Sequence, residues 1–92
     1  MSLDGRFEIP TGVVARNLSG EMVILDLERG IYFGLNPVGT RIWELLGEGR
    51  PATEICQVIP QEYDVGAGEA QADVMALLAE LLSRSLIVPT GE

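Results

Sequence analysis

The segment spanning residues 31–46 changes its hydrophobic period partway along, and this change limits what the chain can fold into. Residues 31–35 alternate between two faces, a spacing that predicts a half-buried β-strand. The residues that follow repeat at helical spacing instead. Asn36 is a good helix N-cap, and Pro37 suits the first helical position because its missing N–H has no partner to lose there. The segment therefore predicts a strand that turns into a helix with almost no loop.

Two further strands are predicted before this segment. Residues 13–18 and 21–27 are separated by the turn pair Ser19-Gly20. The second of these strands is apolar on one face and mixed on the other. Residues 28–30 form a hairpin connection, in which Gly30 is placed to adopt the left-handed conformation. These strands predict a three-stranded antiparallel sheet in chain order, with strand 31–35 at an edge.

Three helices are predicted after the sheet. The first spans residues 37–46 and ends at Gly47. The second begins at Pro51 and should stop at or before Ile59, because Pro60 lacks a backbone donor and clashes with the preceding turn. One further irregular turn at Gln61-Glu62 stays open. The third and longest spans about residues 68–84. Its broad apolar stripe consists of Ala70, Val74, Leu77, Leu78, Leu81 and Leu82.

The resulting fold class is α+β, a three-stranded antiparallel sheet followed by a three-helix, winged-helix-like bundle. The length of 92 residues predicts a single domain over residues 1–92, in which residues 1–11 are expected to form a flexible tail. Trp43 and Cys56 are both expected to be structural, Cys56 as a core residue. About half of the third helix's stripe should face the core, and the sequence does not say which half.

Composition excludes several classes of function. The net charge is −8, and the six basic residues are scattered arginines, so nucleic acid is not an expected partner. The chain has no histidine and one cysteine, which argues against an enzyme, a metal site or a bound cofactor. No apolar run approaches the ~20 residues that span a bilayer, and no signal peptide is visible. We therefore expect a cytoplasmic protein that binds a partner and has no contact with a membrane.

Several strings resemble one family. Residues 23–46 read V-I-L-D-L-E-R-G-I-Y-F-G-L-N-P-V-G-T-R-I-W-E-L-L, residues 62–65 read E-Y-D-V, and residues 81–88 read L-L-S-R-S-L-I-V. In this order they resemble the coenzyme PQQ synthesis protein D (PqqD) family. Its fold is also called the recognition element of ribosomally made and post-translationally modified peptides (RiPPs). The string Y-F-G-L-N-P-V-G is most similar to free-standing recognition proteins of lasso-peptide pathways. Two departures are Ser85, where the family has glycine, and Pro60, which it usually lacks.

The resemblance implies a non-catalytic protein that captures the leader of a precursor peptide and presents it to a maturation enzyme. That enzyme would be a radical SAM enzyme or a leader peptidase. The leader would add a strand along residues 31–35, in a groove closed by the third helix. Gly34 would let the peptide approach closely. The peptide-binding residues expected on this basis are Ile31, Tyr32, Phe33, Gly34, Leu35, Asp73, Val74, Leu77, Leu78 and Leu81. An excess of acidic residues most often serves solubility, and the alternative is that it helps to hold a leader that carries lysine or arginine.

Two alternatives stay open at this point. A winged-helix DNA-binding regulator needs a basic recognition helix, and the third helix here is acidic. A structural homodimer could instead pair the edge strands of two copies.

Overall fold

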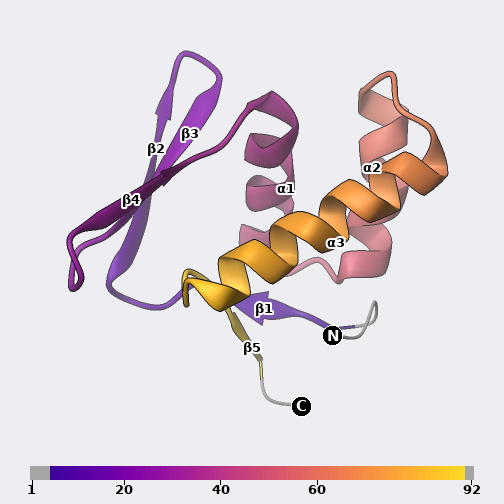
Figure 1. The fold of residues 1–92 in the computed structure, drawn as a ribbon. Coiled ribbons are helices and arrows are strands. Elements are labelled where there is room, and N and C mark those ends of the chain that lie inside the picture. The colour runs from indigo at the N-terminus through magenta and orange to yellow at the C-terminus, as the bar shows by residue number, and fades with distance from the viewer. Residues whose placement is uncertain (1–4, 91–92) are drawn as a thin grey trace.

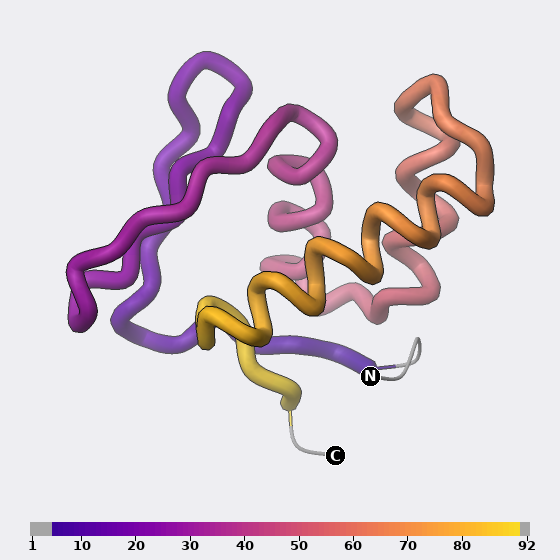
Figure 2. Tube along the Cα trace, viewed as in Figure 1, coloured from indigo at the N-terminus to yellow at the C-terminus, as the bar shows by residue number. Residues whose placement is uncertain are grey.

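The computed structural model describes residues 5–90 and has the predicted α+β architecture (Figure 1). A three-stranded antiparallel sheet comes first, with its strands in chain order, and three helices follow. The strands are β2 (Val13–Leu18), β3 (Glu21–Asp26) and β4 (Ile31–Gly34), and the helices are α1 (Pro37–Gly47), α2 (Ala52–Glu62) and α3 (Ala67–Ser83). Figure 1 shows α3 running in front of α1 and towards the sheet, and Figure 2 shows the same path as a continuous tube.

The two ends of the described chain pair with each other. β1 (Phe7–Glu8) lies antiparallel to β5 (Val88–Pro89), and the Phe7 side chain is buried. The prediction of a flexible tail over residues 1–11 is therefore wrong for this part of it, while residues 1–4 lie outside the described chain. Phe7 packs in the core, and its strand is only two residues long, which is too short for a local sequence pattern to reveal.

Both hairpins of the large sheet use left-handed residues. Ser19 and Gly20 have φ angles of 59° and 91°, so they form the two-residue turn that matches the twist of paired strands. Gly30 has a φ of 70°, as predicted. The loop it closes has one more residue than predicted because β3 ends at Asp26. The Asp26 carboxylate accepts hydrogen bonds from the backbone N–H groups of Glu28 and Arg29, both at 3.1 Å.

Asp26 is a buried carboxylate that holds this hairpin together. The Arg29 guanidinium donates to Asp26 Oδ2 at 2.6 Å, and this bond lowers the pKa of Asp26 below its usual value. Arg29 also donates to the backbone carbonyl of Arg84, just beyond α3. The charged loop therefore connects the β3–β4 hairpin to the C-terminal end of α3.

The core lies between the sheet and the three helices. Trp43 is buried there, as predicted, and Cys56 is half-buried against it. The largest fully buried side chains are Ile24, Ile42, Leu45, Ile55, Ile59, Leu78, Leu81, Leu86, Ile87 and Val74. Every helix and β3 contribute to this set, so the relative positions of β4 and α3 are fixed by packing.

Helix α2 continues past the point where the sequence predicts its end. It extends to Glu62 with Pro60 inside it, so the prediction that it stops at or before Ile59 is wrong. The proline lies in the last turn, where it removes only one intrahelical hydrogen bond. Two contacts hold that turn: the Tyr63 N–H donates to the carbonyl of the fully buried Ile59 at 2.9 Å, and Arg41 donates to the Glu62 carboxylate at 2.8 Å. The packing of Ile59 and the ion pair of Glu62 therefore outweigh the destabilisation that Pro60 causes in the last turn of α2.

The C-terminal end of α3 is closed by a serine in the left-handed conformation. Ser85 has a φ of 57°. Its N–H donates to the Leu82 carbonyl at 3.0 Å, and the Leu86 N–H donates to the Leu81 carbonyl at 2.9 Å. These two bonds form a Schellman motif, which is normally built on glycine. The PqqD family, which the sequence resembles, has glycine where this chain has Ser85. The positive φ at this position explains that preference.

Ser85→Gly should therefore stabilise the protein. Glycine adopts a positive φ without the clash that a Cβ causes, so the free energy of unfolding should rise by about 0.5–1 kcal/mol. Ser83→Gly provides the matched control, because Ser83 is the last residue of α3 and glycine lowers helix propensity. Urea denaturation of both variants measures the difference. Equal loss of stability in the two variants would show that the left-handed serine carries no strain.

Candidate functional site

Strand β4 forms an edge of the sheet and carries unpaired backbone groups. It pairs with β3 on one side, and no other strand of the described chain pairs with the opposite side. The Leu35 N–H donates to the Met22 carbonyl at 2.8 Å, which marks that pair as hydrogen-bonded. Such pairs alternate along an antiparallel ladder, so the backbone groups of Phe33 also point towards β3. Those of Tyr32 and Gly34 point outwards, where they can pair with a further strand.

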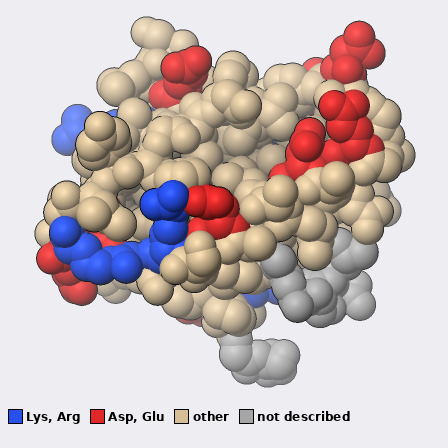
Figure 3. Space-filling view, in the orientation of Figure 1, with Lys and Arg blue, Asp and Glu red and all other residues tan. Residues whose placement is uncertain are grey.

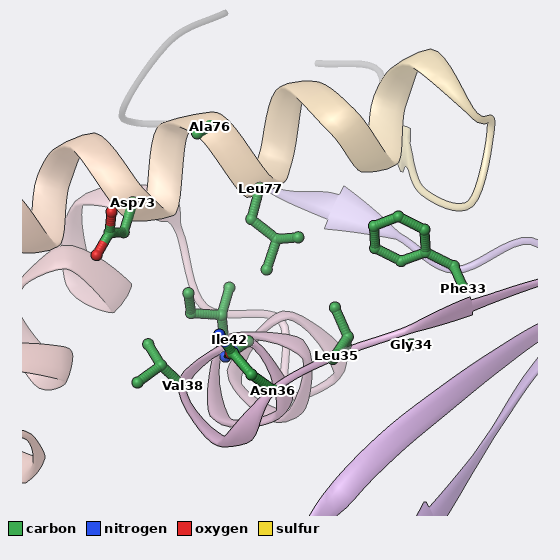
Figure 4. Close-up of a pocket in the computed structure, with 10 residues that line it drawn as sticks. Phe33, Gly34, Leu35, Asn36, Val38, Ile42, Asp73, Ala76 and Leu77 are labelled. Atoms are coloured by element: carbon green, nitrogen blue, oxygen red, sulfur yellow. The ribbon is translucent and has the colours of Figure 1, made fainter.

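A groove with a volume of about 360 Å³ runs beside this edge (Figure 4). Its walls come from the end of β4, the first turns of α1 and one side of α3. The lining residues are Phe33, Gly34, Leu35, Asn36, Val38, Gly39, Ile42, Asp73, Ala76 and Leu77. Most of these side chains are apolar, so the groove suits an extended segment that presents apolar side chains.

The strand-to-helix turn holds the first two walls together. The Asn36 side chain accepts a hydrogen bond from the Gly39 N–H at 2.8 Å, which confirms the predicted N-cap. Gly39 permits a close fit, because a Cβ there would come within 3.3 Å of both the Leu35 and the Asn36 side chains. The Thr40 hydroxyl accepts from the Met22 N–H at 2.9 Å in a buried position. Thr40 thereby completes the end of the β3 ladder after the β4 backbone has turned away.

The third wall comes from α3, and only part of the predicted set forms it. Figure 4 shows Leu77 pointing from α3 towards Leu35 and Ile42, with Asp73 on the same side of the helix, and Ala76 is also part of the lining. Val74, Leu78 and Leu81 were predicted to line this wall, but each is 0% exposed in the core. They support the wall from behind and do not face the groove.

The predicted strand residues divide in a similar way. Phe33, Gly34 and Leu35 line the groove, whereas Ile31 and Tyr32 lie outside its lining. The Tyr32 side chain is 75% exposed, and its backbone groups point outwards from the sheet. Five residues that line the groove were not identified from the sequence: Asn36, Val38, Gly39, Ile42 and Ala76. Helical spacing could have identified three of them, because Ala76 lies three residues after Asp73 and Ile42 lies four after Val38.

Charges are arranged unevenly around the groove. Arg84 lies over the Phe33 ring, 4.8 Å from its centroid, and is paired with Glu80 at 2.7 Å. In Figure 3, basic side chains gather where the β3–β4 hairpin meets the end of α3, and acidic side chains gather over the opposite end of α3. The surface between these two ends is largely uncharged.

The described residues offer little for catalysis. No group of three or more potential metal-binding side chains occurs within residues 5–90. Burial raises the pKa of the Cys56 thiol, which disfavours the reactive thiolate. Cys56 also lies away from the groove, in a separate hollow beside Gln57 and Gln71. In the part of the chain that the structure describes, no helix is long and apolar enough to cross a membrane.

Comparison with known protein families matches most of this chain to one of them. The family model described as coenzyme PQQ synthesis protein D (PqqD) matches residues 21–87. The chain therefore belongs to the PqqD family, which confirms the resemblance inferred from its sequence. Comparison with curated proteins gives no significant match.

Two solved structures share the whole architecture. One shows TbiB1 in complex with the TbiA(beta) leader peptide; it is 38% identical, has a TM-score of 0.81, and the match covers 92% of this chain and 96% of that one. The other shows a lasso peptide synthetase B1 complexed with the leader peptide; it is 26% identical, has a TM-score of 0.83, and the match covers 91% of this chain and 99% of that one. Both similar proteins are thus bound to leader peptides.

Proposed function

We propose that this protein binds the leader segment of a RiPP precursor peptide as an added strand along β4. The outward backbone groups of Tyr32 and Gly34, beside an apolar groove, carry this proposal. An added strand gains affinity from main-chain hydrogen bonds and specificity from the pockets that its alternate side chains fill. Membership of the PqqD family and the two similar leader-peptide complexes support the same assignment.

The protein acts without catalysing a reaction, and its second partner is a maturation enzyme. A bound leader keeps the rest of the precursor at a high effective concentration near that enzyme, which makes their encounter nearly intramolecular. Membership of the PqqD family leaves two candidates for this partner, a radical SAM enzyme and a leader peptidase. Binding to DNA is disfavoured, because α3 contains Glu69, Asp73 and Glu80 and no basic residue.

Gly34→Val tests where the peptide lies. A Cβ built at Gly34 meets no atom within 4 Å, so valine fits the free protein and should barely change its stability. The added side chain would stand where a peptide strand approaches, and we expect affinity for the leader to fall about tenfold. Isothermal titration calorimetry measures this, with the leader taken from a short precursor reading frame beside the gene.

Gly34→Ala is the graded control, because its smaller side chain should cost less affinity than valine. Thermal unfolding of both variants shows whether any loss of binding comes from loss of folding. Unchanged affinity in a folded Gly34→Val variant would remove Gly34 from the binding site.

Sedimentation equilibrium on the same samples shows whether the edge strand pairs two copies. A dimer that the leader peptide cannot dissociate would favour a structural homodimer over a leader-binding protein.

A further inference from the structure

Asp73 is the only ionisable side chain in the lining of the groove. Its carboxylate has no ion-pair partner among the described residues. Arg84 is bound to Glu80, and Arg29 is bound to Asp26. Asp73 therefore places an uncompensated negative charge in a groove whose other side chains are uncharged and mostly apolar.

The position of Asp73 matches the spacing of side chains along an extended peptide. Figure 4 shows the Asp73 carboxylate turned towards Val38 at one end of the groove, and Leu77 turned towards Leu35 in the middle. Four residues along a helix rise about 6 Å. Side chains on one face of a strand repeat every two residues, or about 6.6–6.8 Å. A strand lying between β4 and α3 would thus place one side chain at Leu77 and the next on that face at Asp73.

We infer that Asp73 selects a leader with lysine or arginine two residues from the apolar side chain that contacts Leu77. This inference rests on the proposed function, because it assigns a specificity to the same groove. The direction of the bound chain decides whether the cation precedes or follows the apolar anchor. Asp73 is a specificity-determining residue in this account, while the apolar walls and the β4 edge supply most of the affinity.

The size of the effect follows from the exposure of the carboxylate. Asp73 is exposed at the rim, so an ion pair there gains only a modest advantage in water. We expect the matched cation to improve affinity roughly two- to fivefold over a neutral residue. A glutamate at the same peptide position should lose a similar factor by repulsion, and added salt should weaken both preferences.

Selection from a displayed library of random peptides tests this inference and does not require the natural precursor. The library is selected against the wild-type protein, Asp73→Asn, Asp73→Lys and Glu69→Gln. Glu69→Gln removes the same charge from an exposed position of α3 outside the groove lining, so it controls for the overall charge of −8. Wild type and Glu69→Gln should enrich lysine or arginine two residues from an apolar position. Asp73→Asn should lose that enrichment, and Asp73→Lys should replace it with aspartate or glutamate.

Affinities of three synthetic peptides then quantify the pairing. They derive from one selected sequence and carry lysine, glutamine or glutamate at the critical position. The two- to fivefold preference for lysine over glutamine should vanish in Asp73→Asn and persist in Glu69→Gln. If peptides bind but show no positional preference for a cation, or if Asp73→Asn keeps it, the inference about Asp73 is wrong and the proposed function stands. If no variant enriches any peptide, the proposed function itself fails.

Discussion

Leu78→Asp will unfold this protein, whereas Leu77→Asp will leave it folded and unable to hold a leader peptide. Leu78 is 0% exposed, so aspartate there would bury an unpaired carboxylate and remove core contacts. That change should cost more than about 4 kcal/mol, most of the stability of a small domain. Leu77 is half-buried in the groove lining, and aspartate there can keep its carboxylate in water. Leu77→Asp should lower affinity for a leader whose apolar side chain contacts this position by a factor on the order of one hundred.

Circular dichroism with urea denaturation separates folding from binding in these variants, and calorimetry with the leader peptide measures the affinity that remains. Ala79→Asp is the matched control, because Ala79 lies on α3 with its side chain exposed and outside the groove. Ala79→Asp adds the same charge and should change neither the free energy of unfolding nor the affinity for the leader peptide appreciably. A folded Leu77→Asp variant that binds the leader normally would contradict the assignment of this wall.

Tyr32→Pro should weaken leader binding far more than Tyr32→Ala. The register directs the Tyr32 N–H away from β3, so proline removes a donor from the free edge and leaves the β3–β4 ladder in place. The proline ring also occupies the space into which that N–H points. Loss of one main-chain bond, with its partner left unpaired, should cost about 2–3 kcal/mol, roughly a hundredfold in affinity. Tyr32→Ala keeps the N–H and removes only a side chain that is 75% exposed.

Phe33→Pro completes the comparison at the neighbouring position. The Phe33 N–H points towards β3, so proline there should destabilise the fold instead of acting only on the edge. Thermal unfolding and leader titration of the three variants form the test. Equal affinities for Tyr32→Pro and Tyr32→Ala would show that the peptide does not bond to this edge.

The sequence was most informative where local chemistry determines structure. Asn36 and Pro37 carry the signature of a helix start directly after a strand, and the structure has the predicted cap. Gly30 adopts the left-handed conformation that its place in the hairpin requires. The edge position of β4 followed from the order of three short strands. These features depend on neighbouring residues, so a single sequence is enough to predict them.

The remaining errors depend on packing between distant parts of the chain. The stripe on α3 is wide enough to contact two surfaces, and its spacing cannot tell that Leu78 faces the core while Leu77 faces the groove. Pro60 predicts a helix end, but the burial of Ile59 and the pairing of Glu62 keep the last turn. Phe7 pairs with Pro89 across nearly the whole chain, a contact that local patterns do not record.

Hydrogen exchange at the β4 backbone tests strand addition most directly. In the free protein the Tyr32 and Gly34 amides point away from β3 and should exchange rapidly, whereas the Phe33 amide should be protected. With saturating leader peptide, the Tyr32 and Gly34 amides should gain at least about tenfold protection as they bond to the added strand, and Phe33 should stay protected. If the peptide binds while the Tyr32 and Gly34 amides exchange at their original rates, the leader does not extend this sheet.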